Sequence, residues 1–135
     1  MIKLNQLLLV IIKYSQWLFI SWFVIIAILT LLPGSALPHI SWQFISIDKT
    51  VHIVLFAVLV LFGLLGVENN RLKIGPWPKL TIIMGSIGYG YILEYLQSYV
   101  PDRSYDFADL TADCVGTLVG YGLFLGITII LSKTG

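Results

Sequence analysis

The side chains that could do chemistry fall into three short segments of the sequence, each with helical spacing. These are Asp48 with His52, Glu94 with Gln97, and Asp106 with Asp109 and Asp113. Residues three or four apart lie on one face of a helix, so each segment can present its polar groups together. A carboxylate one turn from an imidazole can orient the ring, and we expect Asp48 to do this for His52.

Two glycines extend the third segment. Gly116 and Gly120 continue the stripe of Asp106, Asp109 and Asp113 along the same helix face. Because glycine allows two helices to approach closely, this face should point into a helix bundle. The acids at its start would then face the polar groups of the other two segments.

Such a cluster suits either ligand binding or acid–base chemistry. We predict a ligand site made of Asp48, Lys49, His52, Glu94, Gln97, Arg103, Asp106, Asp109 and Asp113. For catalysis the candidates are His52 as general acid or base, Glu94 or Asp109 as a second group, and Arg103 to stabilise developing charge. A divalent cation held by Asp106, Asp109, Asp113 and His52 is a variant, since carboxylates suit Mg, Ca or Mn. No resident metal is assigned, and the cofactor is left open.

Structural roles are the alternative for several of these residues. Asp48 can cap a helix, and Asp109 and Asp113 can be first-turn acids that the helix dipole stabilises. Lys49 can extend its ammonium group towards a membrane surface. The sequence leaves both interpretations open for these four residues.

Glu94 is harder to explain structurally than the others. It lies between Leu93 and Tyr95 in an apolar segment, where a carboxyl group needs a partner or a proton. His52 can instead be a core histidine and Arg103 a loop residue. We therefore expect Glu94 to be the most informative member of the cluster.

The composition identifies the environment in which these segments must fold. The chain has 135 residues, of which 58% are hydrophobic and 11% charged, and its mean hydropathy is +0.92. Soluble domains carry about 25% charged residues, so a soluble globular fold is excluded. The net charge of +1 gives no basic surface for nucleic acid. The single cysteine, Cys114, cannot form an intramolecular disulfide.

Four apolar stretches are long enough to cross a bilayer, which takes about 17–25 residues. They cover residues 14–32, 50–67, 80–97 and 108–131, and they predict one domain over residues 1–135. Residues 7–12 are too short to cross and should extend the first helix or lie at the interface. The first stretch could also be a signal peptide, but its apolar part is too long for one. The predicted fold is all-α, a bundle of four transmembrane helices.

Basic residues give the orientation. Six of the eight lie on the side that holds both termini, and Lys49 and Arg103 lie on the other. Short loops rich in lysine and arginine stay in the cytoplasm, so both termini should be cytoplasmic in a multi-pass protein of the plasma membrane. The polar cluster would then form a pocket that opens outwards.

At these residues the chain resembles the VanZ-like family of small membrane proteins, over residues 29–122. The shared motifs are Leu32-Pro33-Gly34-Ser35 with Leu37-Pro38, Asp48-Lys49 with His52 and Phe56, Glu94 with Gln97, and Arg103, Asp106 and Asp109 leading to Gly116 and Gly120. Asp113 departs from the pattern, where the family often has Asn. The resemblance implies a four-helix membrane fold and an association with resistance to the glycopeptide teicoplanin, but it implies no reaction.

Three functions fit these observations. The first is an envelope protein that binds a glycopeptide, a cell-wall precursor or another lipid-linked ligand within the lipid bilayer. The second is a membrane enzyme that acts on a lipid-linked phosphate or sugar through His52. The third, a transporter or proton relay, ranks last because the cytoplasmic half of each predicted span is apolar.

Overall fold

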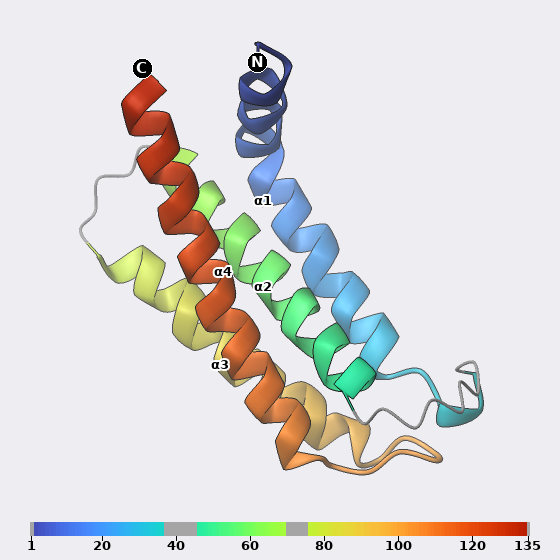
Figure 1. The fold of residues 1–135 in the computed structure, drawn as a ribbon. Coiled ribbons are helices and arrows are strands. Elements are labelled where there is room, and N and C mark those ends of the chain that lie inside the picture. Colours follow the sequence, from blue (N-terminus) through green and yellow to red (C-terminus); the bar gives the residue numbers. More distant parts are fainter. Residues whose placement is uncertain (1, 37–45, 70–75, 135) are drawn as a thin grey trace.

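The computed structural model describes residues 2–36, 46–69 and 76–134. They form four long helices, α1 (Ile2–Thr30), α2 (Ser46–Asn69), α3 (Trp77–Gln97) and α4 (Phe107–Thr134), and a short 3-10 turn, η1 (Gly34–Ala36). No strand occurs in these ranges, so the all-α prediction is confirmed. The helices alternate in direction, and both termini lie at the same end of the bundle (Figure 1).

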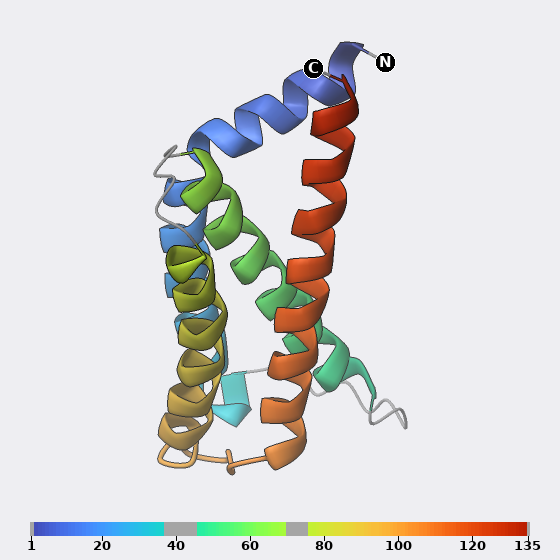
Figure 2. The ribbon, with the colours of Figure 1, turned by 90° about the vertical axis from the view of Figure 1, so that its left-hand side faces the viewer.

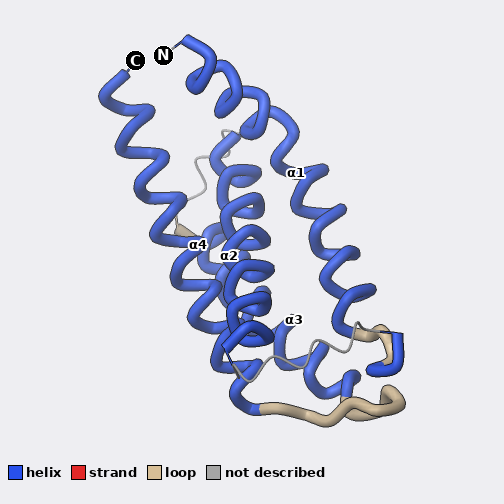
Figure 3. Tube along the Cα trace, turned by 45° about the vertical axis from the view of Figure 1, so that its right-hand side comes forward, coloured by secondary structure: helices blue, strands red, loops and turns tan. Residues whose placement is uncertain are grey.

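Helix α2 is the centre of the bundle. It packs against all three other helices, most extensively against α4 and then against α1. The view in Figure 3 shows α2 between α1 and α4, with α3 behind. Side chains of α2 therefore contact each of the three other helices.

The predicted spans agree with the helices except at the first. Residues 50–67, 80–97 and 108–131 lie inside α2, α3 and α4. The first span, predicted over residues 14–32, instead belongs to a helix that begins at Ile2 and ends at Thr30, so residues 7–12 extend it. Pro33 fixes its own φ and disfavours helix for the residue before it, which is why the helix stops short of the end of the apolar run.

Three helices are long and apolar enough to cross a membrane, over Gln6–Thr30, Asp48–Asn69 and Phe107–Lys133. Helix α3 has 21 residues, a sufficient length, but Glu94, Gln97 and its glycines and tyrosines make it less apolar than the others. Large apolar side chains such as Ile20, Met84 and Leu118 are more than half exposed, as expected where lipid replaces water.

Helices α2 and α4 pack so closely that their backbones are in contact. A Cβ atom at Gly116 would lie 2.5 Å from the Ile53 carbonyl oxygen, and one at Gly120 would meet the carbonyl of Ala57. Only glycine fits these places, as the stripe of small residues predicted. Ile53 follows His52 directly, so this contact also brings α4 to the polar residues of α2.

Helix α1 bends, and its amino-terminal part crosses over one end of the bundle towards the end of α4 (Figure 2). The Ser15 hydroxyl donates to the Ile12 carbonyl at 2.7 Å, a bond within the helix that favours bending. Further along, Trp22 Nε1 donates to the Leu55 carbonyl at 2.9 Å and ties α1 to α2. Ile11 and Ile12 pack against the buried core of α2 and α4, so α1 contacts the bundle on both sides of Ser15.

Candidate functional site

Buried polar side chains gather where α2 and α4 begin and α3 ends. These helix ends lie at the end of the bundle opposite the two termini (Figure 1). The buried members are His52, Glu94, Gln97, Asp109 and Asp113, each no more than 7% exposed. Three helices supply them, as the spacing predicted. A carboxylate inside a membrane protein is unfavourable unless it is paired, so Glu94, Asp109 and Asp113 each need a partner.

His52 finds its partner on another helix. Its Nδ1 lies 2.9 Å from Asp113 Oδ1, and both side chains are buried. The expectation that Asp48 orients the ring is therefore wrong. The Asp48 side chain is 60% exposed, with a carboxylate oxygen 3.7 Å from the Lys49 ammonium. The glycine contact between α2 and α4 is what brings Asp113 to His52.

Lys49 is held between two acids of α4. Its ammonium group donates to Asp106 Oδ2 at 2.6 Å and also to Asp109 Oδ1. The hydrogen bond from Lys49 holds the pKa of Asp106 below its ordinary value, and the bond from the Ala108 backbone N–H acts in the same direction. A divalent cation shared by Asp106 and Asp109 would have to displace this ammonium group, which disfavours the cation site expected there.

Asp106 also starts helix α4. Its Oδ1 accepts a hydrogen bond from the Ala108 backbone N–H at 2.8 Å, the usual contact of an N-cap residue with the second residue of a helix. Its own backbone N–H donates to Glu94 Oε2 at 3.3 Å. One residue therefore fixes the start of α4, the position of Lys49 and one oxygen of Glu94.

Two buried side-chain oxygens in the cluster have no hydrogen-bond partner among the described residues. They are Glu94 Oε1 and Gln97 Oε1, on side chains that are 1% and 3% exposed. The buried hydroxyl group of Thr117, one turn after Asp113, also lacks a hydrogen-bond partner among the described residues. Unpaired buried oxygens are uncommon in folded proteins, and each calls for a water, an ion or a ligand.

A cavity of about 170 Å³ opens beside these groups. Its polar lining comes from Thr30, Asp48, His52, Gln97 and Arg103. Arg103 Nε lies 3.5 Å from the Leu32 carbonyl, at the long limit of a hydrogen bond, which places the guanidinium group beside the end of α1. A small polar group of a ligand can reach both His52 and Arg103 here.

The nine predicted ligand residues thus come together at one end of the bundle, through direct contacts or through this shared cavity. Thr30 and Thr117 were not predicted. The signal for Thr117 is its spacing of four residues after Asp113 on the acidic stripe. For Thr30 no sequence signal existed, because only the packing of α1 on α2 brings it to the cavity.

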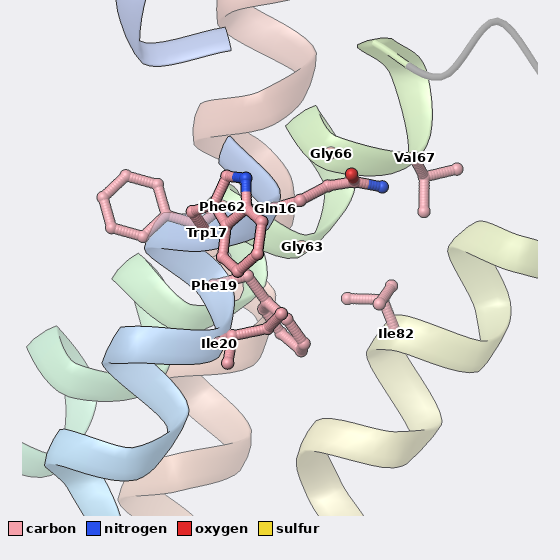
Figure 4. A pocket seen from close by; sticks show the side chains of 9 residues that line it. All are labelled: Gln16, Trp17, Phe19, Ile20, Phe62, Gly63, Gly66, Val67 and Ile82. Atoms are coloured by element: carbon pink, nitrogen blue, oxygen red, sulfur yellow. The ribbon is translucent and has the colours of Figure 1, made fainter. Parts of the chain in front are cut away.

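A larger cavity, of about 430 Å³, lies between α1, α2 and α3, away from the charged cluster. Figure 4 shows aromatic and aliphatic side chains around it, with Gln16 as its polar group. Gly63 and Gly66 line it from α2. Its lining suits an apolar chain, and it contains no acid or base.

Comparison with known proteins gives one family. The family model described as VanZ/LLP1 matches residues 5–131, nearly the whole chain. No curated protein and no solved structure matches the sequence. The match includes all three polar segments and the two glycines that join α2 to α4.

Proposed function

Because this multi-pass membrane protein belongs to the VanZ/LLP1 family, we propose that it acts at the cell envelope. In this proposal the polar cluster binds the head group of a cell-wall precursor, a glycopeptide or another lipid-linked ligand. Binding of this kind would contribute to teicoplanin resistance. The protein would lie in the plasma membrane with both termini in the cytoplasm and the cavity facing outwards.

The observation that carries this proposal is the cavity beside unpartnered buried oxygens. A bundle end that served only for packing would satisfy its polar atoms internally, yet Glu94 and Gln97 each leave an oxygen without a partner among the described residues. Gln97 also lines the cavity, together with His52 and Arg103. Donor groups of a ligand, such as hydroxyls or amines, would complete the site.

The charges of the surrounding side chains indicate which kind of head group the site would bind. Five carboxylates surround the site, and Lys49 is already engaged by Asp106 and Asp109. Arg103 is then the cation that faces the cavity. The site therefore favours a head group rich in hydroxyl or amino groups with at most one anionic group near Arg103.

The resistance proposal is tested in a teicoplanin-sensitive host that has a cell wall. Susceptibility is measured with the wild-type chain and, at matched membrane abundance, with Asp48→Asn, His52→Gln, Glu94→Gln and Asp109→Asn. Glu68→Gln is the matched control, because Glu68 is an exposed acid at the other end of α2. We expect wild type and Glu68→Gln to protect and the four site variants to lose protection. No protection by wild type would refute the resistance role, and equal protection by all variants would refute the site.

Orientation is tested separately. In a Cys114→Ala background, Ser104→Cys lies in the loop between α3 and α4, and Ser132→Cys lies near the end of α4. A membrane-impermeant thiol reagent added to intact cells should label Ser104→Cys and spare Ser132→Cys. The opposite labelling would put the cavity in the cytoplasm and end the envelope proposal.

A second candidate is acid–base catalysis on a lipid-linked phosphate or sugar. It is favoured by the His52–Asp113 pair, since a carboxylate on Nδ1 fixes the ring and leaves Nε2 for a substrate proton. Glu94 or Asp109 would be the second acid–base group. An enzyme should lose turnover in His52→Gln while it keeps ligand affinity, whereas a binding protein should lose affinity in step with the cavity substitutions.

A further inference from the structure

We propose that His52, Glu94 and Asp113 bind one divalent transition-metal ion, of the kind that accepts nitrogen and oxygen ligands together, such as Zn²⁺ or Mn²⁺. Each residue offers one ligand atom, and these three atoms lie within 4.8 Å of one another. They come from α2, α3 and α4, so the ion would join three helices. The site expected from the sequence combined Asp113 and His52 with Asp106 and Asp109, whereas this one combines them with Glu94.

The geometry of the closest pair suits an ion. His52 Nδ1 and Asp113 Oδ1 are 2.9 Å apart. Two ligand atoms at about 2.1 Å from a metal are about 3 Å apart at the roughly 90° angle of an octahedral ion and about 3.4 Å apart at a tetrahedral angle. The same spacing therefore serves a hydrogen bond when the site is empty and a shared metal when it is filled.

The charges around the triad call for a cation. Glu94 and Asp113 are each 1% exposed, and the ammonium group of Lys49 is engaged by other acids. Burying carboxylates without compensation is unfavourable, and an ion of charge 2+ would balance two of them. With one imidazole among the ligands, Zn²⁺ or Mn²⁺ fits better than Mg²⁺ or Ca²⁺, which prefer oxygen ligands throughout.

Two unpartnered oxygens distinguish this triad from an ordinary acidic cluster. Glu94 Oε1 is buried and lacks a hydrogen-bond partner in the part of the chain that is described. Gln97, one turn later, is 3% exposed, leaves its amide oxygen unpaired and lines the cavity with His52. Three protein ligands leave coordination positions for water, and the Gln97 amide can accept a hydrogen bond from that water.

An outer triad competes for the same imidazole. Asp48, His52 and Asp109 also lie close enough to hold an ion. However, Asp109 accepts the Lys49 ammonium, and the Asp48 side chain is 60% exposed. The inner triad is buried throughout and has a free carboxylate oxygen, so we assign the ion there. This inference is independent of the envelope ligand, because an ion can bind whether or not a glycopeptide does.

The test uses the full chain, purified with chelator and placed in nanodiscs. Mn²⁺ binding is followed by the loss of the electron paramagnetic resonance signal of free Mn²⁺, and Zn²⁺ is added as competitor. We expect one ion per chain. Loss of an outer partner of a metal site costs about 10–100-fold in affinity, so loss of a ligand in Glu94→Gln should weaken binding by about 100-fold or more.

Two variants are controls. Asp102→Asn removes an exposed acid at the same end of the bundle, and Asn tolerates the φ of 61° found there. It should bind as wild type does. Asp48→Asn tests the outer triad and should also keep the ion. If Asp48→Asn loses the ion and Glu94→Gln keeps it, the inner triad is wrong.

A spectroscopic test avoids dependence on the folding of Glu94→Gln. The sequence has two histidines, His39 and His52, so in a His39→Gln chain a ¹⁴N imidazole coupling to bound Mn²⁺ must come from His52. We expect that coupling in pulsed paramagnetic resonance. Absence of the coupling, or Mn²⁺ uptake no greater than that of empty nanodiscs, would overturn the proposal.

Discussion

Replacing Gly116 with alanine should push α4 away from α2. The new Cβ atom would lie 2.5 Å from the Ile53 carbonyl oxygen and 3.0 Å from Ile53 Cα. Both are backbone atoms, so rotation of a side chain cannot make room. The carbonyl contact alone needs about 0.9 Å of separation to reach 3.4 Å, the short end of ordinary contact.

The expected change in the free energy of unfolding is the sum of two opposing effects. Overpacking an interface costs about 1–3 kcal/mol, while alanine in place of glycine within a helix gains up to about 1 kcal/mol. Gly122 lies on the same helix, and a Cβ there meets nothing within 4 Å. Gly122→Ala therefore receives the gain without the cost. The free energy of unfolding of Gly116→Ala should be lower than that of Gly122→Ala by about 1–3 kcal/mol.

The assay is reversible unfolding of the full chain in mixed micelles, followed by tryptophan fluorescence. A second readout is the environment of His52, because Ile53 follows His52 and Gly116 lies three residues after Asp113. Separation of the helices should lengthen the His52–Asp113 contact, which imidazole ¹⁵N shifts report. Equal stability of the two alanine variants, with unchanged His52 shifts, would refute the close packing of α2 on α4.

Two further predictions concern Lys49. Lys49→Met leaves Asp106 and Asp109 without their cation and should lower the free energy of unfolding by about 1–3 kcal/mol. The control Lys79→Met breaks an exposed pair with Glu68 and should change the free energy of unfolding by less than about 1 kcal/mol. Similar effects of both variants would contradict the paired state of Lys49. The second prediction is a pH dependence of stability: the pKa of Asp106 in the folded chain is below its ordinary value of 3.8, so its contribution is present above that value and is lost as the pH falls through the folded pKa. The free energy of unfolding, measured from about pH 6 down to about pH 3, a range that brackets the ordinary pKa of 3.8, should therefore depend less on pH in Asp106→Asn than in wild type. An unchanged slope would contradict the link between Asp106 and Lys49.

Much of the fold follows from the sequence because apolar length and breakers act locally. Long apolar runs predicted four helices, and Pro33 and the Pro76–Pro78 segment separate three of them. The spacing of Gly116 and Gly120 predicted which face of α4 packs closely, and the contact with α2 confirms it. The sequence left open whether residues 7–12 extend the first helix, and α1 includes them together with residues 2–6 and 13.

The partners within the polar cluster could not be predicted in the same way. Spacing relates residues of one helix, so it paired His52 with Asp48 and was silent about Asp113 on α4. Lys49 was likewise read as a cation for a ligand, but two acids of α4 engage it. Such choices depend on the register and distance between helices, which the Gly116 contact sets and which no local pattern encodes.

The position of the cluster along the bundle argues for chemistry at one end rather than transport through it. Past Asp113 and Thr117, the interior between α2 and α4 is filled by Val60, Leu64 and Phe124, all buried. A proton or ion path requires polar groups within reach of one another along the whole span. Within the described residues, the Ser15 hydroxyl at the far end donates to a carbonyl of its own helix and offers no such step. In the function proposed above, a ligand would approach His52 and leave from the same side, as binding or acid–base catalysis requires.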